Sequence, residues 1–354
     1  MIDLNKILRE FQIESTIENY GNGHINDTYL TDPDKYILQR INTKIFKNHI
    51  ELMDNINNVT SFLREKIVKE GGDPDRETLT VVKTKDGKNY YEYDSENVFR
   101  VYKFITGTKT IEQSTSADDM YYAGKGFGRF AGMLNDYPAD KLYETIVDFH
   151  NTPKRVEALK KAISDDVAKR ASSVQPEIEF ALKNAEFAGK VVEAMASGEI
   201  PLRVTHNDTK INNILFDEKT SEAVCVIDLD TVMPGSALYD FGDALRIGAS
   251  TAAEDETDLS KVQFSKEYFK GFAKGYFEEM KEYLTEKEIE LLPFSAKLLT
   301  YECGIRFLTD YLNGDTYFKT HYEQHNLDRA RNQFKLVSDI ANLEDELNKI
   351  VAEL

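Results

Sequence analysis

The first part of the chain alternates between short apolar runs and turn residues. Residues 17–42 predict three strands, separated by a Gly-rich turn and by an Asp-Pro turn. An amphipathic stretch precedes them, and apolar residues at helical spacing predict a helix over roughly 45–69. Residues 78–107 alternate with period two around Asp86-Gly87, which indicates a hairpin.

From residue 108 onward the pattern changes to long amphipathic helices. Apolar positions recur three or four residues apart over roughly 117–136, 139–149, 153–169, 174–196, 264–283, 286–312 and 322–352. One charged island interrupts the helices at 203–236. Within it, two strand-like runs at 213–216 and 223–229 flank a charged turn.

The strand-rich pattern of the first part and the helical pattern of the second part predict an α+β protein with two lobes. A small, mainly antiparallel lobe would occupy residues 1–107, and a large helical lobe would occupy 108–354. A chain of 354 residues is long enough to bury a core in each lobe. We expect a ligand in the cleft between them.

The charged island contains the residues best suited to chemistry. In "HNDTKINN", His206, Asp208, Lys210 and Asn213 follow the spacing His-x-Asp-x-Lys-x-x-Asn. The catalytic loops of protein kinases are similar, because a short loop can place a carboxylate beside an alcohol while its far end reaches a metal ion on the phosphates. The spacing indicates Asp208 as general base, Lys210 as a contact for the transferring phosphoryl group and Asn213 as a metal ligand. The alternative is an ordinary polar loop.

Two aspartates follow at the end of the next strand-like run. In "VIDLDT", Asp228 comes after four strand-forming residues, and Asp230 lies two positions further. A carboxylate at a strand end just past such a loop suits a magnesium ligand, and Asp230 could contribute to a second metal site. The alternative is a solvated strand end. The joint order of Gly-rich hairpin, strand, loop and aspartate favours the metal site.

The motifs resemble those of the aminoglycoside phosphotransferase and choline kinase superfamily, the small-molecule relatives of protein kinases. The segments "YGNGHINDTY", "ILQRIN", "THNDTKINN", "CVIDLDTVMPGSALYDFGDALR" and "ECGIRFLTDYLNGDTYF" are similar to bacterial N-acetylhexosamine 1-kinases over about residues 15–320. The resemblance implies a protein-kinase-like fold, ATP and Mg²⁺ as cofactors, and phosphoryl transfer to the anomeric hydroxyl of GlcNAc or GalNAc. Choline, homoserine or aminoglycoside kinases and a non-catalytic nucleotide-binding regulator are the alternatives.

The nucleotide would lie against the N-terminal lobe. Glycines in "GNGH" would let backbone amides approach the phosphates, although an ordinary hairpin turn has the same composition. The run "YILQRIN" lacks the lysine that protein kinases carry there, so Arg40 is the expected phosphate cation, with a solvent-exposed Arg40 as the alternative. Glu51 would be its earliest acidic partner or a surface residue. The nucleotide-binding residues expected from these segments and from the hinge are Gly21, Gly23, His24, Arg40, Lys103, Phe104 and Ile105.

The acceptor would bind in the C-terminal lobe. Arg306 lies among apolar residues and therefore needs a partner, either the ligand or a carboxylate such as Asp243 or Asp310. Planar polar groups and aromatic rings suit a neutral sugar. The expected acceptor-binding residues are Asp208, Thr231, Asp243, Arg306 and Tyr317.

Two further patterns imitate known motifs. "LYDFGDALRI" contains Asp-Phe-Gly, but Asp240 lies too far beyond Asn213 for the metal site that Asp228 already fills. We expect Asp240 near a helix N-terminus, where it braces the loop backbone. "YYAGKGFGRFAGML" has small residues near helical spacing and no preceding strand, so it predicts close helix packing.

Charge and composition limit the kinds of partner expected for the chain. A net charge of -18 argues against nucleic acid or an anionic membrane, because phosphate surfaces attract basic proteins. The N-terminus lacks the apolar core of a signal peptide, and no apolar run reaches the length of a membrane span. Cys225 and Cys303 lie in apolar runs and predict buried, reduced thiols. We therefore expect a cytoplasmic monomer that acts on a small-molecule amino sugar.

Overall fold

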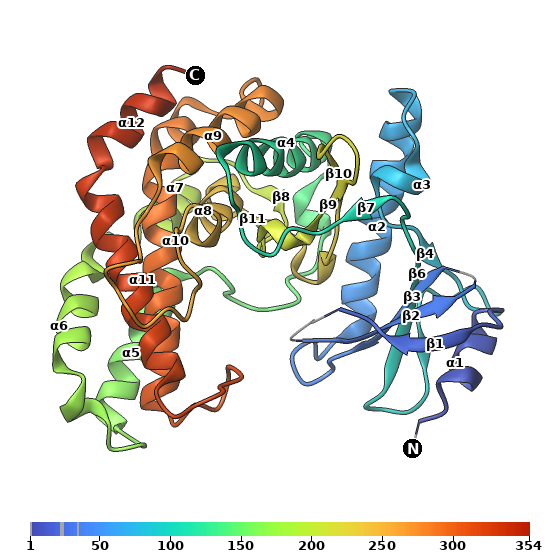
Figure 1. Cartoon of the computed structure of the whole chain (residues 1–354), viewed down its shortest axis with the longest axis horizontal. Coiled ribbons are helices and arrows are strands. Elements are labelled where there is room, and N and C mark those ends of the chain that lie inside the picture. Colours follow the sequence, from blue (N-terminus) through green and yellow to red (C-terminus); the bar gives the residue numbers. More distant parts are fainter. Residues whose placement is uncertain (1, 22–24, 34) are drawn as a thin grey trace.

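The computed structural model describes residues 2–21, 25–33 and 35–354. It has a small lobe built around an antiparallel sheet and a larger lobe that is mostly helical (Figure 1). The predicted α+β architecture is confirmed. The β-rich island that carries the His-x-Asp motif lies between the sheet of the small lobe and the helices of the large lobe (Figure 1).

The sheet of the N-terminal lobe is covered by helices on both faces. Its strand order is β1-β2-β3-β6-β4, and β5 also pairs with β6. Alternate residues of β6 face opposite sides: Phe99 and Val101 join the core under α1, whereas Val98 and Tyr102 join the core under α2. The elements are α1 (Leu4–Glu10), β1 (Thr16–Asn19), β2 (Asp27–Asp32), β3 (Tyr36–Ile41), α2 (His49–Lys69), α3 (Pro74–Glu77), β4 (Val81–Val82), β5 (Tyr91–Glu92) and β6 (Val98–Lys103).

The hairpin predicted around Asp86-Gly87 is only partly correct. The turn forms, since Gly87 has a φ of 78° and the Thr84 N–H donates to the Lys88 carbonyl at 2.8 Å. The flanking strands do not pair with each other in the sheet. They pair with β6 instead, β4 at one end and β5 at the other, because β6 is buried along almost its whole length and offers a longer ladder.

The β-rich island of the C-terminal lobe consists of two small antiparallel sheets. One joins β8 (Arg203–Thr205) to β11 (Met233–Gly235), and the other has the order β10-β9-β7. Strand β7 belongs to the segment that leaves the N-terminal lobe, so the lobe connection is itself part of this sheet. The remaining elements are β7 (Thr108–Lys109), η4 (Ile211–Asn213), β9 (Ile214–Asp217), β10 (Ala223–Val226) and η5 (Leu229–Thr231).

Helices make up the rest of the C-terminal lobe. The helices predicted over 174–196 and 322–352 are each broken into shorter helices. Across the described part of the chain, none of the helices is both long and apolar enough to cross a membrane. The elements are α4 (Ala117–Met133), η1 (Ala139–Lys141), α5 (Thr152–Asp165), η2 (Ala171–Ser173), α6 (Gln175–Lys183), η3 (Asn184–Phe187), α7 (Lys190–Ser197), α8 (Ala237–Gly248), α9 (Lys266–Met280), α10 (Glu286–Leu312), α11 (His325–Asn342) and α12 (Glu344–Ala352).

The helix predicted over 139–149 is wrong. Only the short η1 forms there, and an irregular segment leads to α5. Asn55 of α2 explains the difference: its side-chain amide donates to the Tyr143 carbonyl at 2.8 Å and accepts the Tyr143 N–H at 2.9 Å. These bonds take both backbone groups that a helix would use at Tyr143.

Glycines allow α4 and α9 to touch through their backbones. A Cβ atom added to Gly124 would lie 2.2 Å from the Phe272 carbonyl oxygen on α9, and one added to Gly275 would lie 2.0 Å from the Tyr121 carbonyl oxygen on α4. Both distances are far below van der Waals contact, so side chains at these positions would push the helices apart. The predicted role of the "AGKGFG" run in helix packing is confirmed.

Gly124→Ala should lower the free energy of unfolding by about 1–3 kcal/mol, because the helices must separate to admit the methyl group. Lys270→Ala is a matched control on the exposed side of α9 and should change stability by less than about 0.5 kcal/mol. Chemical denaturation followed by circular dichroism measures both variants. Wild-type stability in Gly124→Ala would contradict the close packing.

Candidate active site

The candidate catalytic loop, between β8 and η4, is held by hydrogen bonds to its backbone. Asp240 in the first turn of α8 accepts the His206 N–H at 2.8 Å and the Asn207 N–H at 2.7 Å. The Thr209 hydroxyl donates to the Asp240 carbonyl at 2.6 Å. Burial raises the pKa of Asp240, although His206 and the two backbone N–H groups favour its ionised form. The prediction that Asp240 braces the loop is confirmed.

Asp243 supports the same loop and does not have the free carboxylate expected of an acceptor-binding residue. One of its oxygens accepts the Thr209 N–H at 3.0 Å, and the other accepts from the Arg246 guanidinium at 3.0 Å. The side chain is buried. Arg246 also pairs with Glu254 at 2.6 Å. The expected contact between Asp243 and the acceptor therefore does not fit its surroundings.

His206 connects the loop to the strand that ends before Asp228. Its Nδ1 accepts the Asp208 N–H at 3.2 Å, so Nε2 carries the proton and donates to the Ile227 carbonyl at 2.9 Å. The ring is fully buried against two phenylalanines of α4, Phe127 and Phe130. The imidazole thus sets the spacing between the loop and the aspartate strand.

Asp208 lies between a cation and an amide. The Lys210 ammonium is 3.0 Å from Oδ1, and the Asn213 amide donates to Oδ2 at 3.2 Å and to the Asp208 carbonyl at 2.8 Å. Burial favours the protonated acid, but the charge and hydrogen bond of Lys210, with the charges of His206 and Arg246, together outweigh it and lower the pKa of Asp208, while Asp208 raises the pKa of Lys210. The side chains of Asp208 and Lys210 are 24% and 37% exposed, so both can meet a ligand.

Asp228 has an exposed carboxylate on a strained backbone. Its φ of 59° lies in the left-handed region, which residues other than glycine adopt rarely and often at functional sites. The protein packed around the carboxyl group, together with the charges of Asp230 and Asp208, raises the pKa of Asp228 to about 6. A divalent cation would relieve the repulsion among these three carboxylates.

Asn213 and Asp228 together fit a magnesium ion. The Asn213 NH₂ group is used in its bonds to Asp208, which leaves Oδ1 as an available oxygen ligand. The Ile227 N–H donates to the Asn213 carbonyl at 2.9 Å, which holds the backbone before the exposed Asp228 next to Asn213. The described residues contain no cluster of three or more His, Cys, Asp or Glu side chains arranged to hold a metal. Mg²⁺ is commonly bound by one or two protein carboxylates plus phosphate and water, and this donor set matches that habit.

Asp230, expected as a second metal ligand, lies in a buried ion pair. One oxygen is 2.5 Å from Arg100 Nη1 on β6, and the other accepts from the Asn26 side-chain amide at 2.7 Å. The side chains of Arg100 and Asp230 are only 1% and 4% exposed. A metal could reach Asp230 only by opening this pair, so the carboxylate available to a metal is that of Asp228. Sequence reasoning missed Arg100 altogether.

Arg40 does not occupy the place expected of the phosphate cation. It forms an ion pair with Asp27 and a hydrogen bond to the Asn97 side chain at 3.1 Å, and its side chain is 40% exposed. Alternation along β3 places Gln39 on the opposite face, where its Oε1 accepts from Arg100 Nε at 3.0 Å and Nη2 at 2.9 Å. The alternative of a solvent-exposed Arg40 is the one the structure supports.

Two of the three N–H groups expected to read adenine at the hinge are already used within the protein, whereas the expectation for the carbonyl groups of Lys103 to Ile105 stays a prediction. The Lys103 N–H donates to the Thr80 carbonyl at 3.0 Å, and the Phe104 N–H donates to the Lys35 carbonyl at 3.0 Å. Neither amide is therefore free to read adenine. For Ile105 the described residues provide no hydrogen-bond acceptor to its N–H, so it is the amide left for a base edge. Tyr20 contacts the Phe104 ring edge-on at 5.9 Å and covers this end of the hinge.

Of the nucleotide-binding residues expected in the Gly-rich turn, the described residues include Gly21. Gly21 is exposed and has a φ of 72°, a conformation that glycine adopts without strain. Gly23 and His24, expected to bind the nucleotide, lie outside the described residues. Glu51 forms no ion pair with any described residue, and Met53 of the same helix approaches Arg100 Nη1 with its sulfur at 4.0 Å.

Arg306 lies between aromatic rings on the acceptor side. Its guanidinium is 5.5 Å from the Phe149 ring centroid and 5.7 Å from that of Phe318. Arg155 lies next to the same phenylalanine, because it donates to the Phe149 carbonyl at 2.8 Å. Its buried Nε has no partner among the described residues. Burial and the nearby Arg306 charge lower the pKa of Arg155. Sequence reasoning identified Arg306 and missed Arg155.

Carboxylates near Arg306 are already occupied. Asp310 accepts the N–H groups of Thr316, Tyr317 and Phe318, each at 2.9 Å, so it orders the loop after α10. No described carboxylate forms an ion pair with Arg306, and the predicted structural pairs with Asp243 or Asp310 are absent from this part of the chain. Arg306 therefore lacks an acidic partner.

The two remaining acceptor candidates differ in access. Tyr317 is 60% exposed and its ring contacts Phe318 edge-on at 4.8 Å. Thr231 is buried, and its hydroxyl donates to the His206 carbonyl at 2.6 Å. The expected hydroxyl contact from Thr231 to the acceptor does not fit this bond, whereas Tyr317 stays available.

A buried pair links the arginine cluster to the loop. His150 Nδ1 lies 2.8 Å from Glu302, and its Nε2 lies 3.1 Å from the carbonyl of Asn207, the residue before Asp208. Glu302 is one helical turn before Arg306 on α10, and Phe149 precedes His150. Arg306 and Phe149 are thereby held on the Asp208 side of the C-terminal lobe.

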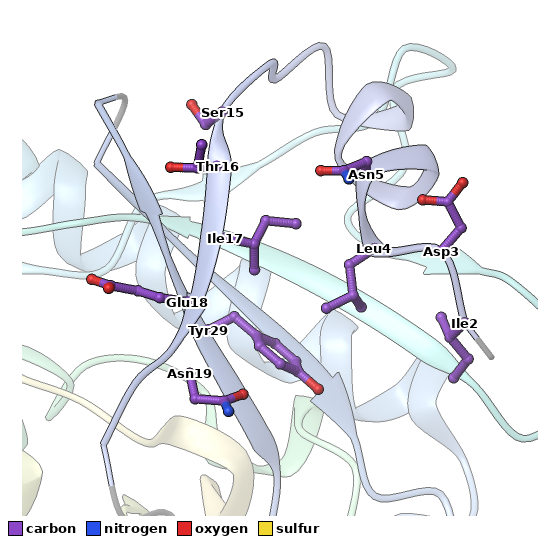
Figure 2. Close-up of a pocket in the computed structure, with 10 residues that line it drawn as sticks. All are labelled: Ile2, Asp3, Leu4, Asn5, Ser15, Thr16, Ile17, Glu18, Asn19 and Tyr29. Atoms are coloured by element: carbon purple, nitrogen blue, oxygen red, sulfur yellow. The ribbon is translucent and has the colours of Figure 1, made fainter.

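One open groove lies away from this site. A groove of about 890 Å³ runs between the α1 segment and β1, lined in part by Leu4, Ile17 and Tyr29 (Figure 2). It lies on the α1 face of the sheet, whereas Arg100 and Gln39 project from the α2 face toward the loop. The catalytic residues contribute nothing to its lining.

Comparison with known proteins agrees with this geometry. The sequence matches the phosphotransferase enzyme family over residues 16–283, so the chain belongs to that family. Its fold is similar to those of an aminoglycoside phosphotransferase from Alicyclobacillus acidocaldarius (12% identity, 100% of this chain and 97% of that chain, TM-score 0.63) and a microcompartment-associated aminopropanol kinase (14%, 98% and 98%, 0.60). It is also similar to an amicoumacin kinase solved with AMP-PNP and Ca²⁺ (16%, 95% and 94%, 0.59). The protein-kinase-like fold is thus shown.

Asp240→Asn should lower the free energy of unfolding by about 1–3 kcal/mol, because an amide offers one acceptor oxygen where the carboxylate serves two buried N–H groups. Asp140→Asn, at an exposed position, is the matched control. Urea denaturation at neutral pH measures both. If Asp240→Asn were as stable as Asp140→Asn, the bracing role of Asp240 would be wrong.

Proposed function

We propose that this phosphotransferase is an ATP- and Mg²⁺-dependent kinase that phosphorylates the anomeric hydroxyl of an N-acetylhexosamine, GlcNAc or GalNAc. Membership of the family supports phosphoryl transfer, and the motif resemblance over about residues 15–320 supports the sugar. The product would be the sugar 1-phosphate.

The pair of arginines around Phe149 is the main observation that supports a neutral acceptor. Arg306 and Arg155 form no ion pair with a carboxylate of the described residues, although the Glu302 charge acts on both, and aromatic rings adjoin Arg306. A cationic acceptor such as choline or an aminoglycoside would be repelled there. A neutral sugar would instead present hydroxyl and acetamido oxygens to the guanidinium donors and a ring face to the aromatic side chains, with Tyr317 at the edge.

The loop would perform the transfer by positioning and charge. The Asp208 carboxylate would accept the proton of the attacking hydroxyl, and Lys210 would contact the transferring phosphoryl group. Their separation of 3.0 Å lets one small site serve both the acceptor and the phosphoryl group. Asp240, Asp243 and His206 would act only by holding the loop.

Asn213 Oδ1 and the Asp228 carboxylate would hold Mg²⁺, which when bound supplies positive charge beside the β- and γ-phosphates. The raised pKa of Asp228 supports this role: burial is its main cause, and the rest comes from the Asp230 and Asp208 charges, whose repulsion a cation would offset. The nucleotide and Ca²⁺ seen with the amicoumacin kinase of similar fold are consistent with it. Ile105 and Gly21 would contact the base and the phosphates.

A choline, homoserine or aminoglycoside kinase is the runner-up, and an aminoglycoside phosphotransferase of similar fold supports the last of these. A non-catalytic nucleotide-binding regulator is disfavoured, because every position of the loop motif carries a chemically competent side chain.

An acceptor panel separates these functions. Consumption of ATP should be fastest with GlcNAc or GalNAc and slow with glucose, choline, homoserine and kanamycin, because only the acetylated sugars offer the expected oxygens without a positive charge. A coupled ADP-release assay at equal acceptor concentrations measures this. Turnover of another acceptor with neither acetylated sugar accepted would overturn the sugar assignment and leave phosphotransferase activity standing.

Asp208→Asn should lower kcat by about 10²–10⁴-fold, since the amide cannot accept the hydroxyl proton. The fold should persist, because Asn is isosteric. Asp86→Asn, in an exposed turn far from the loop, is the matched control and should retain full turnover. Near-normal kcat in Asp208→Asn would remove Asp208 from the role of general base.

A further inference from the structure

The described residues leave one part of the nucleotide site without an assigned group, namely the cation for the α- and β-phosphates. Kinases of this architecture need such a cation, because the transferring chain of phosphates carries several negative charges. Arg40 is directed to the outer face of the sheet, where Asp27 and Asn97 hold it. The cation must therefore come from another residue of the α2 face.

We propose that Arg100 of β6 holds the α- and β-phosphates of the nucleotide, with Asp230 and Gln39 as the residues that position its guanidinium. This inference rests on the proposed function only in its requirement for a nucleotide and is independent of the acceptor. It concerns residues that the sequence motifs do not mark.

The strand register supports this assignment. Gln39 on β3 is directly opposite Arg100 on β6, so both side chains project from the α2 face. In protein kinases the phosphate-binding lysine lies on the strand that corresponds to β3. Arg100 lies on the neighbouring strand β6 and projects from the same face of the sheet. It would therefore take the place of that lysine.

The surroundings of Arg100 place it where phosphates would lie. Asp230 is two residues beyond Asp228, the proposed metal ligand, and Asn26 beside the Gly-rich turn donates to the same Asp230 carboxylate. Arg100 therefore lies at the junction of the metal strand, the phosphate-covering turn and the inner face of the sheet. A metal on Asp228 would carry the phosphates to this junction.

The hydrogen bonds of the guanidinium leave it capacity for a ligand. Nε and Nη2 each donate once to Gln39, and Nη1 faces Asp230 and the Met53 sulfur. A guanidinium has five N–H groups, so Nη2 retains one that no described residue accepts. The side chain is only 1% exposed and lies over the Tyr102 ring, so the proposal requires that the bound nucleotide open this N–H to a phosphate oxygen while the Asp230 pair stays formed. The fork can serve a carboxylate and a phosphate at once, which an ammonium group does less well.

Asp230 also takes over a task that a glutamate of the second helix performs in protein kinases. In those enzymes an ion pair between the strand lysine and that helix orients the cation. In this chain α2 presents Met53 to Arg100, and Glu51 has no ion pair with a described residue. The orienting carboxylate comes instead from the C-terminal lobe, which couples the cation to the metal strand.

Arg100→Lys tests the proposal against a purely structural ion pair. The binding of ADP, AMP and adenosine is measured by titration calorimetry in the presence of Mg²⁺, with adenosine by competition. We expect ADP affinity to fall at least about tenfold, because lysine cannot make the forked contact, while adenosine affinity stays within about twofold. Arg40→Lys is the matched control on the neighbouring strand and should bind ADP like the wild type.

Gln39→Met provides a second variant in case Arg100→Lys does not fold. It keeps the shape of the side chain but removes the acceptor that orients the guanidinium, so ADP affinity should fall several-fold and adenosine affinity should not. Unchanged ADP affinity in folded Arg100→Lys or Gln39→Met, or an equal loss of ADP and adenosine, would overturn the proposal. A wild-type chain that binds no ADP would overturn both this inference and the proposed kinase, whereas failure of the sugar assignment alone would leave these binding results unchanged.

Discussion

The buried ion pair between Arg100 and Asp230 fixes a central strand of the N-terminal sheet to the strand end that carries Asp228. A guanidinium that is 1% exposed and a carboxylate that is 4% exposed are costly to bury unless they remain together. Because Arg100 belongs to the central sheet of the N-terminal lobe and Asp230 to the β-rich island, this requirement joins the lobes. Asn26 adds the turn region of the N-terminal lobe to the same carboxylate. The pair therefore fixes the position of the exposed Asp228 and of the loop relative to the sheet of the N-terminal lobe.

The C-terminal lobe holds the irregular loop in one conformation. Two aspartates of α8 accept backbone N–H groups of the loop, and His206 connects it to the aspartate strand. These groups are buried, so each unmade bond would cost stability. Asp208 and Lys210 are left partly exposed by contrast, which is the condition for meeting a ligand. The residues that hold the loop are therefore buried and already have hydrogen-bond partners, whereas Asp208 and Lys210 remain free to contact a ligand.

Local spacing was sufficient to predict that Asp208, Lys210 and Asn213 lie together and that Asp228 follows a strand, because those relations depend on residues close in sequence. Relations between distant residues were harder. Arg40 and Gln39 differ by a single step of strand alternation, and the partner of Gln39, Arg100, follows only from a cross-strand register. Thr231 and Asp243 carry polar groups suited to a sugar, yet their hydrogen bonds go to the loop backbone. The helix expected over 139–149 failed for the same reason, since Asn55 of a distant helix takes the backbone groups of Tyr143.

The most direct test of this account is a crystal structure of the chain with AMP-PNP, Mg²⁺ and GlcNAc. The account predicts a guanidinium nitrogen of Arg100 within about 3 Å of an α- or β-phosphate oxygen, with the Asp230 pair still formed and the metal on Asn213 and Asp228. A structure in which Arg40 turns inward to contact the phosphates, while Arg100 keeps only its present partners, would contradict it.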